Sequence, residues 1–273
     1  MKMKLKNKWV KMRRFILAVA VGIAAVCGAQ PAPLVHGHAH NDYLHTRPLL
    51  DALDQGFCSV EADIFLVDGK LLVAHTRSAT KPEHTLQALY LDPLRERVKK
   101  NGGRVYANGP EFTLLIDLKT EWRTIYPVLQ TVLKDYSDIF SAFHDDSKDT
   151  KAITAVISGN RSLEMFKGES VRYAAYDGQL TDLDSSQSRN LIPWISGEWG
   201  ATFRWTGKGD MSNEDRQRLK EIVLKAHQKG RQVRFWGAPD KPVFWSEMLS
   251  KDVDLINTDD LTGLRKFFEE RDK

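Results

Sequence analysis

Short apolar runs alternate with longer amphipathic segments along most of the chain. Runs of this length, rich in Val, Ile, Leu and aromatic residues, are typical of strands buried in a parallel sheet. A hairpin is expected across Asp68-Gly69, with residues 70–75 as its second strand. Counting the hairpin with its first strand gives eight strand positions, at residues 33–39, 57–66, 112–120, 152–160, 171–177, 191–197, 232–238 and 253–260.

The segments between these runs repeat apolar residues at helical spacing. Strands that alternate with helices imply crossover connections and a parallel sheet. Eight such units predict an α/β fold, a single (β/α)8 TIM barrel, and no GxGxxG or GxxxxGK[ST] motif points to a nucleotide-binding open sheet. Residues 80–111 form a long, partly helical connection. Helices are expected over residues 46–56, 121–138, 161–169, 212–230, 241–251 and 260–273.

Residues 1–29 follow a different pattern. A head rich in Lys and Arg precedes the apolar run FILAVAVGIAAVCGA, which is typical of a secretory signal peptide cleaved after Ala29. We therefore expect a signal peptide over residues 1–29, export to the periplasm or the extracellular space, and one domain over residues 30–273. Lipoprotein anchoring at Cys27 is the less favoured alternative, because Val26 is a poor residue before such a cleavage site.

The N-terminal segment also carries the positive charge. The sequence has 40 Lys and Arg against 36 Asp and Glu, and seven of the cations but none of the acids lie in residues 1–29. Residues 30–273 therefore have three more acids than cations, which excludes a generally basic nucleic-acid-binding surface. Cys58 is the only cysteine in that part of the sequence, so the core and not a disulfide is expected to stabilise a monomer.

Acidic residues stand near the ends of two predicted strands, where barrel enzymes carry their catalytic groups. Glu61 and Asp63 are two residues apart in SVEADIF and therefore face the same side, and Asp117 in TLLIDLKT projects from the strand expected beside them. Three converging carboxylates predict one divalent cation, Mg²⁺ or Ca²⁺. A structural ion-pair network is the alternative, but Lys119 alone does not balance three acids.

Histidines alternate in HGHAHNDY, at His36, His38 and His40. His40 ends the first predicted strand and His75 ends the hairpin, so these two imidazoles could flank the metal as a general acid and base. A cation with two histidines suits phosphoryl transfer, and Lys119 would stabilise the phosphate charge. His38 could be a hydrogen-bond partner beneath the site or incidental, and His36 is treated as incidental.

Together, HNDY, the ExD and DxK pairs and His75 resemble the PLC-like phosphodiesterase superfamily. That superfamily includes glycerophosphodiester phosphodiesterases, phosphatidylinositol-specific phospholipases C and sphingomyelinase D. The chain is most similar to the branch with a SHNDY-type opening, akin to the yeast altered-inheritance-of-mitochondria protein, from about residue 35 to about residue 260. The HRG and ENT motifs of glycerophosphodiester phosphodiesterases are absent, and Thr76 stands where an acidic residue often follows the second histidine.

The resemblance implies a metal-dependent phosphodiesterase, a phosphoric diester hydrolase that acts on a small-molecule or phospholipid phosphodiester, with peripheral membrane contact. It implies that His40 and His75 are catalytic, and that Glu61, Asp63 and Asp117 bind the cation. The substrate contacts implied by the resemblance are Asn41, Lys119, Asn160, Trp236 and Asn257.

Two other functions fit parts of the sequence. Amidohydrolases bind zinc through an HxH motif at the end of the first strand, and HGHAH contains that motif twice, with Asp259 near the last strand. The remaining histidines fall in predicted loops or helices, which disfavours zinc. An exported barrel that binds a phosphorylated ligand without catalysis is the second alternative, and the complete set of candidate catalytic residues disfavours it.

Overall fold

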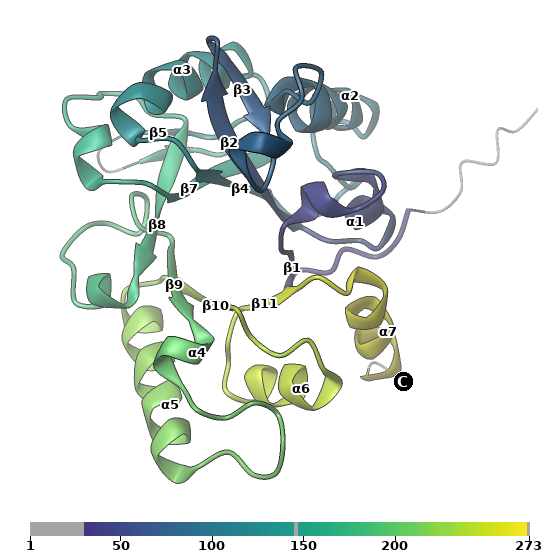
Figure 1. Cartoon of the computed structure of the whole chain (residues 1–273), viewed down its shortest axis with the longest axis vertical. Coiled ribbons are helices and arrows are strands. Elements are labelled where there is room, and N and C mark those ends of the chain that lie inside the picture. Colours follow the sequence, from purple (N-terminus) through teal and green to yellow (C-terminus); the bar gives the residue numbers. More distant parts are fainter. Residues whose placement is uncertain (1–29, 145–146, 272–273) are drawn as a thin grey trace, which may run out of the picture.

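The computed structural model describes residues 30–144 and 147–271. Its strands close into a barrel, because β1 pairs in parallel with both β11 and β2 (Figure 1). The predicted TIM barrel is thereby confirmed. Its eight parallel strands, among the described residues, are β1 (Gly37–Ala39), β2 (Ser59–Val67), β4 (Phe112–Leu118), β7 (Ile153–Gly159), β8 (Ala174–Gln179), β9 (Trp194–Glu198), β10 (Gln232–Trp236) and β11 (Leu255–Thr258).

Helices surround the strands, as Figure 1 shows for α1, α5, α6 and α7. No helix in the described part of the chain is both long and apolar enough to cross a membrane. The helices are α1 (Leu50–Asp54), α2 (Asp92–Lys100), α3 (Trp122–Asp135), α4 (Trp199–Thr202), α5 (Asn213–Gln228), α6 (Pro242–Ser250) and α7 (Leu261–Arg271). A π-helical turn leads into α2 at Gln87–Leu91, and 3₁₀ turns lie at Asp42–Leu44, Arg77–Ala79, Leu163–Phe166 and Leu180–Asp182.

The helix predicted over residues 161–169 is wrong. Only the 3₁₀ turn Leu163–Phe166 follows β7, and Gly168 at φ 80° ends the segment. So few residues form a helix only at a high entropic cost, unless packing supports them. The segments that follow β7 and β8 are therefore short turns and loops.

The predicted hairpin is present. β3 (Lys70–Val73) pairs antiparallel with the second half of β2, across a turn in which Asp68 and Gly69 have φ of 48° and 75°. Two positive φ angles are required by the tight turn that matches the twist of paired strands. A second small sheet joins β5 (Ala142–Phe143) to β6 (Lys148–Asp149).

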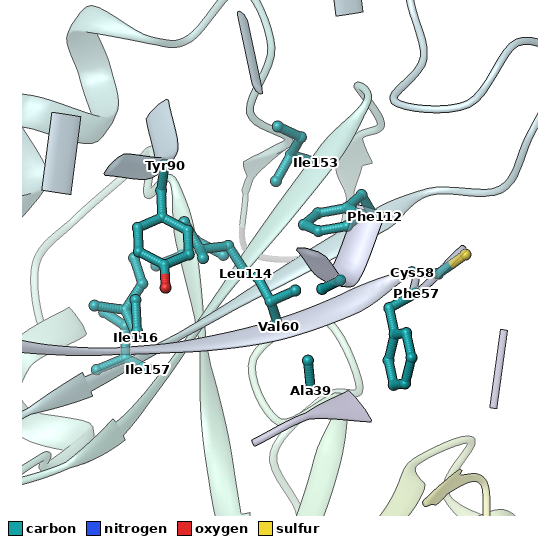
Figure 2. Packing of buried hydrophobic residues seen from close by; sticks show 14 of the residues in the cluster. Ala39, Phe57, Cys58, Val60, Tyr90, Phe112, Leu114, Ile116, Ile153 and Ile157 are labelled. Carbon is teal, nitrogen blue, oxygen red and sulfur yellow. The ribbon is translucent and has the colours of Figure 1, made fainter. Parts of the chain in front are cut away.

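The two faces of the barrel wall have different surroundings. On the outer face, Val60, Leu114 and Ile116 are fully buried in a large apolar cluster that includes Tyr90 (Figure 2). On the inner face, Leu115, Val156 and other apolar side chains form a separate small cluster. Polar side chains take the remaining inner positions, and they build the site described below.

The loop between β1 and α1 is held by one buried carboxylate. The Asp42 side chain is inaccessible to solvent, and its Oδ2 accepts hydrogen bonds from the Leu49 backbone N–H (2.5 Å) and the Tyr90 hydroxyl (2.8 Å). Leu49 has φ 65°, a conformation that is costly for a residue with a Cβ. The Asp42 carboxylate therefore stabilises a strained loop, and this loop carries His40.

Asp42→Ala is expected to lower the free energy of unfolding by about 2–4 kcal/mol, because the Leu49 N–H and the Tyr90 hydroxyl would remain buried without a partner. Urea unfolding followed by circular dichroism measures the change. Asp42→Asn keeps a side-chain oxygen for both donors and is the matched control, expected to lose less. Equal losses in the two variants would contradict the assigned role of the oxygen.

Candidate active site

A cavity of about 680 Å³ opens at the carboxyl ends of the barrel strands. This is the end at which TIM-barrel enzymes carry their active sites. Lining residues come from strands on every side of the barrel mouth. Of the residues predicted from the sequence, those on the cavity wall are His40, Asn41, Glu61, His75, Asp117, Lys119 and Trp236.

The three predicted metal ligands lie together. Asp63 on β2 and Asp117 on β4 are register partners, and Glu61 lies two residues before Asp63 on the same inner face. One oxygen from each of the three carboxylates lies within 4.8 Å of the others. The Lys119 ammonium sits between two of them, with its Nζ 2.9 Å from Asp63 Oδ2 and 2.9 Å from Asp117 Oδ1.

Two buried carboxylate oxygens of this cluster lack a hydrogen bond, and only one of them, Asp117 Oδ1, has the Lys119 ammonium as an ionic partner. Asp63 is inaccessible to solvent, and its Oδ1 lacks a hydrogen bond from any described residue. Burial, followed by the charge of Glu61, raises the pKa of Asp63 to about 6. A buried acceptor without a donor is costly. An all-oxygen donor set with a free buried oxygen fits a hard divalent cation such as Mg²⁺ or Ca²⁺.

Glu61 has two partners inside the barrel. Its Oε2 lies 3.3 Å from Arg234 Nη1 and 3.4 Å from His38 Nε2. Burial opposes ionisation, but the contacts with His38 and Arg234 outweigh it and lower the pKa of Glu61 to about 2. Burial and Arg234 lower the pKa of His38 to about 4, and its Nδ1 lies 2.7 Å from Ser59 Oγ. His38 is therefore a neutral hydrogen-bonding residue beneath the site.

The two candidate catalytic histidines are each held at Nδ1. His40 Nδ1 lies 2.9 Å from Asp259 Oδ1, and His75 Nδ1 lies 2.9 Å from the Tyr43 hydroxyl. Burial alone would lower the pKa of His40, but the hydrogen bond to Asp259 and the charges of Glu61 and Asp259 raise it above its usual value. With Nδ1 engaged, Nε2 is the nitrogen of each ring that is left for chemistry, and at His40 it also lies 3.2 Å from Asn41 Nδ2 on the cavity wall.

Among the further polar residues that line the cavity, four contact one another, and none of these was predicted from the sequence: Arg161, Asp177, Ser196 and Arg234. Ser196 Oγ donates to Asp177 Oδ1 at 2.6 Å, and Asp177 Oδ2 lies 3.7 Å from Arg234 Nη2 and 3.6 Å from Arg161 Nη2. Arg234 alternates with apolar residues in QVRFW, a signal of an inward-facing polar position that could have been used.

Two predicted substrate contacts do not lie on the cavity wall. Asn160 turns back to donate from Nδ2 to the Lys119 carbonyl at 3.1 Å. Asn257 is nearly inaccessible inside the barrel, where its Oδ1 accepts from Arg234 Nη1 at 3.0 Å. Both amides satisfy protein groups, so we do not retain them as substrate contacts.

The arrangement does not support the zinc alternative. His36 contacts the Asp254 carbonyl at 2.9 Å, His38 is enclosed inside the barrel, and only His40 reaches the mouth. Within residues 30–144 and 147–271, one group of three or more His, Cys, Asp or Glu side chains could hold an ion, and it consists of the three carboxylates. No imidazole belongs to that group.

A known protein family matches the part of the chain that carries most of the candidate site. The model of a family described as the AIM6-like phosphodiesterase domain matches residues 29–177, more than half of the chain. This range contains both candidate catalytic histidines, the three carboxylates and Lys119. Arg234, Trp236 and Asp259 lie beyond it.

Fungal relatives match over most of the chain. "Altered inheritance of mitochondria protein 6" of Eremothecium gossypii is 32% identical over 270 residues, with 86% of this chain and 69% of the relative covered. The protein named as its homolog in Arthroderma benhamiae is 28% identical, with 88% and 85% covered.

The predicted export is contradicted by these relatives. The fungal proteins, including one from Saccharomyces cerevisiae, are named for the inheritance of mitochondria, which does not agree with a cleaved and exported enzyme. A basic head before an apolar run is a compositional pattern and does not by itself specify one destination, which is why the prediction failed. Residues 1–29, on which the predicted signal peptide and the anchor at Cys27 rest, lie outside the described residues.

A solved structure shares the fold. The glycerophosphodiester phosphodiesterase of Parabacteroides distasonis superposes with a TM-score of 0.52 at 16% identity, covering 90% of this chain and all of that protein. This likeness supports the barrel independently of sequence. The resemblance seen in the sequence motifs is confirmed by the matching family model and the fungal relatives, and the chain belongs to the AIM6-like phosphodiesterase domain family.

Proposed function

We propose that residues 30–273 form one metal-dependent phosphodiesterase domain that uses His40 and His75 as an acid and base pair. Glu61, Asp63 and Asp117 would hold one divalent cation, Mg²⁺ or Ca²⁺. The observation that carries the proposal is the meeting of these carboxylates, with an unpaired buried oxygen on Asp63, and two imidazoles at one barrel mouth.

The protein groups have separate tasks in this scheme. One imidazole takes a proton from the nucleophile, which is water or a hydroxyl of the substrate, as the oxygen of the nucleophile bonds to phosphorus. The other gives a proton to the leaving oxygen as its bond to phosphorus breaks. Both transfers use Nε2, because Nδ1 of His40 faces Asp259 and Nδ1 of His75 faces Tyr43. Lys119 supports the negative charge on the phosphate. When bound, the cation supplies Lewis-acid neutralisation of a non-bridging phosphate oxygen.

The mouth of the barrel fits a small-molecule or phospholipid phosphodiester. Asn41, Lys119 and Trp236 are the predicted substrate contacts that line the cavity. Exposed apolar side chains also lie at or after the carboxyl ends of two strands, with Leu44 after β1, Trp236 as the last residue of β10 and Val243 after it. Apolar groups around a mouth support peripheral contact with a lipid surface. A monomeric state and the absence of a nucleic-acid partner remain predictions.

His40→Ala and His75→Ala are each expected to lower kcat by at least about 100-fold, because each removes a proton-transfer group. The assay follows products by phosphorus NMR with glycerophosphodiesters, phosphatidylinositol, lysophospholipids and sphingomyelin, with Mg²⁺, Ca²⁺ or chelator. His227→Ala is the matched control, because this exposed imidazole pairs with Asp254 outside the cavity. Full activity in both active-site variants would refute the acid and base roles. Silence of the wild-type chain throughout would favour the binding-protein alternative.

Cation binding is expected to raise the melting temperature of chelator-treated protein, because a ligand that binds only the folded state stabilises it by about 2.7 kcal/mol at 100 times its Kd. Asp117→Asn should abolish most of this shift with Mg²⁺ or Ca²⁺. Glu111→Gln is the control, since Glu111 pairs with Lys148 just before β4, at the opposite end of the strand from Asp117. Identical shifts in the two variants would place the cation elsewhere.

A further inference from the structure

Tyr43 belongs to the HNDY motif, and the acid and base scheme gives it no task. Its hydroxyl lies 2.6 Å from Asp63 Oδ2, 2.7 Å from Asn41 Oδ1 and 2.9 Å from His75 Nδ1. Tyr43 is absent from the cavity lining, whereas His75 and Asn41 are part of it. The hydroxyl therefore lies behind the cavity wall, between a candidate metal ligand and a candidate catalytic histidine.

Counting hydrogens decides how these groups are connected. A phenol has one O–H to donate and lone pairs to accept with. The Asp63 carboxylate can only accept while it is ionised, and at 2.6 Å it is the shortest of the three contacts, as expected for a charged acceptor. Once the O–H points to Asp63, the Tyr43 oxygen can only accept, so both remaining neighbours must donate to it. Asn41 donates through its NH2, which a flip of the amide brings to the 2.7 Å contact, and His75 donates through Nδ1. The hydrogen of neutral His75 must then be on Nδ1, and Nε2 is left bare.

Little else holds the His75 ring. The side chain is 57% exposed. Besides the hydrogen bond with Tyr43, it has one ionic contact among the described residues, with Asp63, whose Oδ2 lies 3.5 Å from His75 Nδ1. Its ring stacks on the Tyr43 ring, with centroids 6.4 Å apart and planes inclined by 21°. His75 follows β3, whose ladder partner is β2 alone apart from a single bridge between Leu72 and Thr85. An exposed ring at the end of such a strand needs a fixed neighbour to keep one orientation.

We propose that Tyr43 is a positioning residue that fixes the ring and the tautomer of His75, so that its bare Nε2 faces the cavity. The proposal rests on the proposed role of His75 in proton transfer. In this proposal both histidines are oriented in the same way, because a neighbouring side chain contacts Nδ1 of each ring. The neighbour is the Asp259 carboxylate at His40 and the Tyr43 phenol at His75. Partners that orient a metal-bound histidine contribute about 10- to 100-fold to metal affinity or activity, and we expect the same range for a partner of His75.

The first test is nitrogen-15 NMR of the histidine rings in the full chain without metal. Spectra are recorded near pH 8, and the two ring nitrogens of His75 are compared for the one that carries hydrogen. The wild-type protein should show His75 with hydrogen on Nδ1, and Tyr43→Phe should lose that preference. His75→Gln assigns the signal by its disappearance. A bare Nδ1 in the wild-type protein, or an unchanged His75 signal in Tyr43→Phe, would overturn the proposal.

The second test is kinetic. Tyr43→Phe should lower kcat by about 10- to 100-fold and leave KM within about twofold, because the lost hydroxyl does not line the cavity. Tyr126→Phe is the matched control, since it removes a hydroxyl that donates to Glu169 Oε2 at 2.8 Å, outside the cavity lining. The control should retain full kcat, and thermal melting should show both variants folded.

Tyr43 also contacts a candidate metal ligand, so the assay is repeated with increasing Mg²⁺ and Ca²⁺. A loss of kcat that persists at saturating metal supports positioning of His75. A loss that disappears at saturating metal assigns the effect to Asp63 and overturns the proposal. If the wild-type chain cleaves none of the phosphodiesters, the proposed function fails, but the NMR result still tests the link between Tyr43 and His75.

Discussion

Repulsion among carboxylates at one end of the barrel is the constraint on which the site depends. Like charges about 4 Å apart repel by about 4 kcal/mol at the effective dielectric of a protein surface, so three of them would otherwise destabilise the barrel mouth. Lys119 lies between Asp63 and Asp117, and Arg234 reaches Glu61 from β10. Two cations against three acids leave a negative excess, and the unpaired Asp63 oxygen lies within it. A divalent cation would offset that excess.

The barrel could be predicted from the chain because parallel strands are buried on both faces and appear as apolar runs. The alternation of strands with helices is interrupted after β7, where a 3₁₀ turn replaces the expected helix, and after β8, which a 3₁₀ turn also follows. In the connection after β7, a 3₁₀ turn packs against the barrel in place of a helix. The spacing of apolar residues over nine positions does not distinguish such a turn from a helix. The long segment after β3 contains a helix, α2, as expected.

The site was only partly predictable. The rule that catalytic groups lie at strand ends found the carboxylates and both histidines, but it ignored Arg234, an inner-face residue whose long side chain extends to the mouth. Counting Lys119 alone therefore understated the positive charge. Alternating histidines lie on the same side of a strand but at different depths in the barrel, because two residues span about 6.6 Å along the strand. For this reason His38 and His40 have different surroundings, which spacing alone cannot show.

The two candidate catalytic histidines follow strands that differ in how many neighbouring strands hold them. His40 follows β1, which is held between β11 and β2, and its own backbone N–H donates to the Thr258 carbonyl at 3.0 Å. His75 follows β3 at the open end of the hairpin, away from the Asp68-Gly69 turn, and β3 is an edge strand outside the closed barrel ring. Because β3 is an edge strand and β1 belongs to the closed ring, a displacement of β3 would change the separation of the two imidazoles and leave the barrel strands in place.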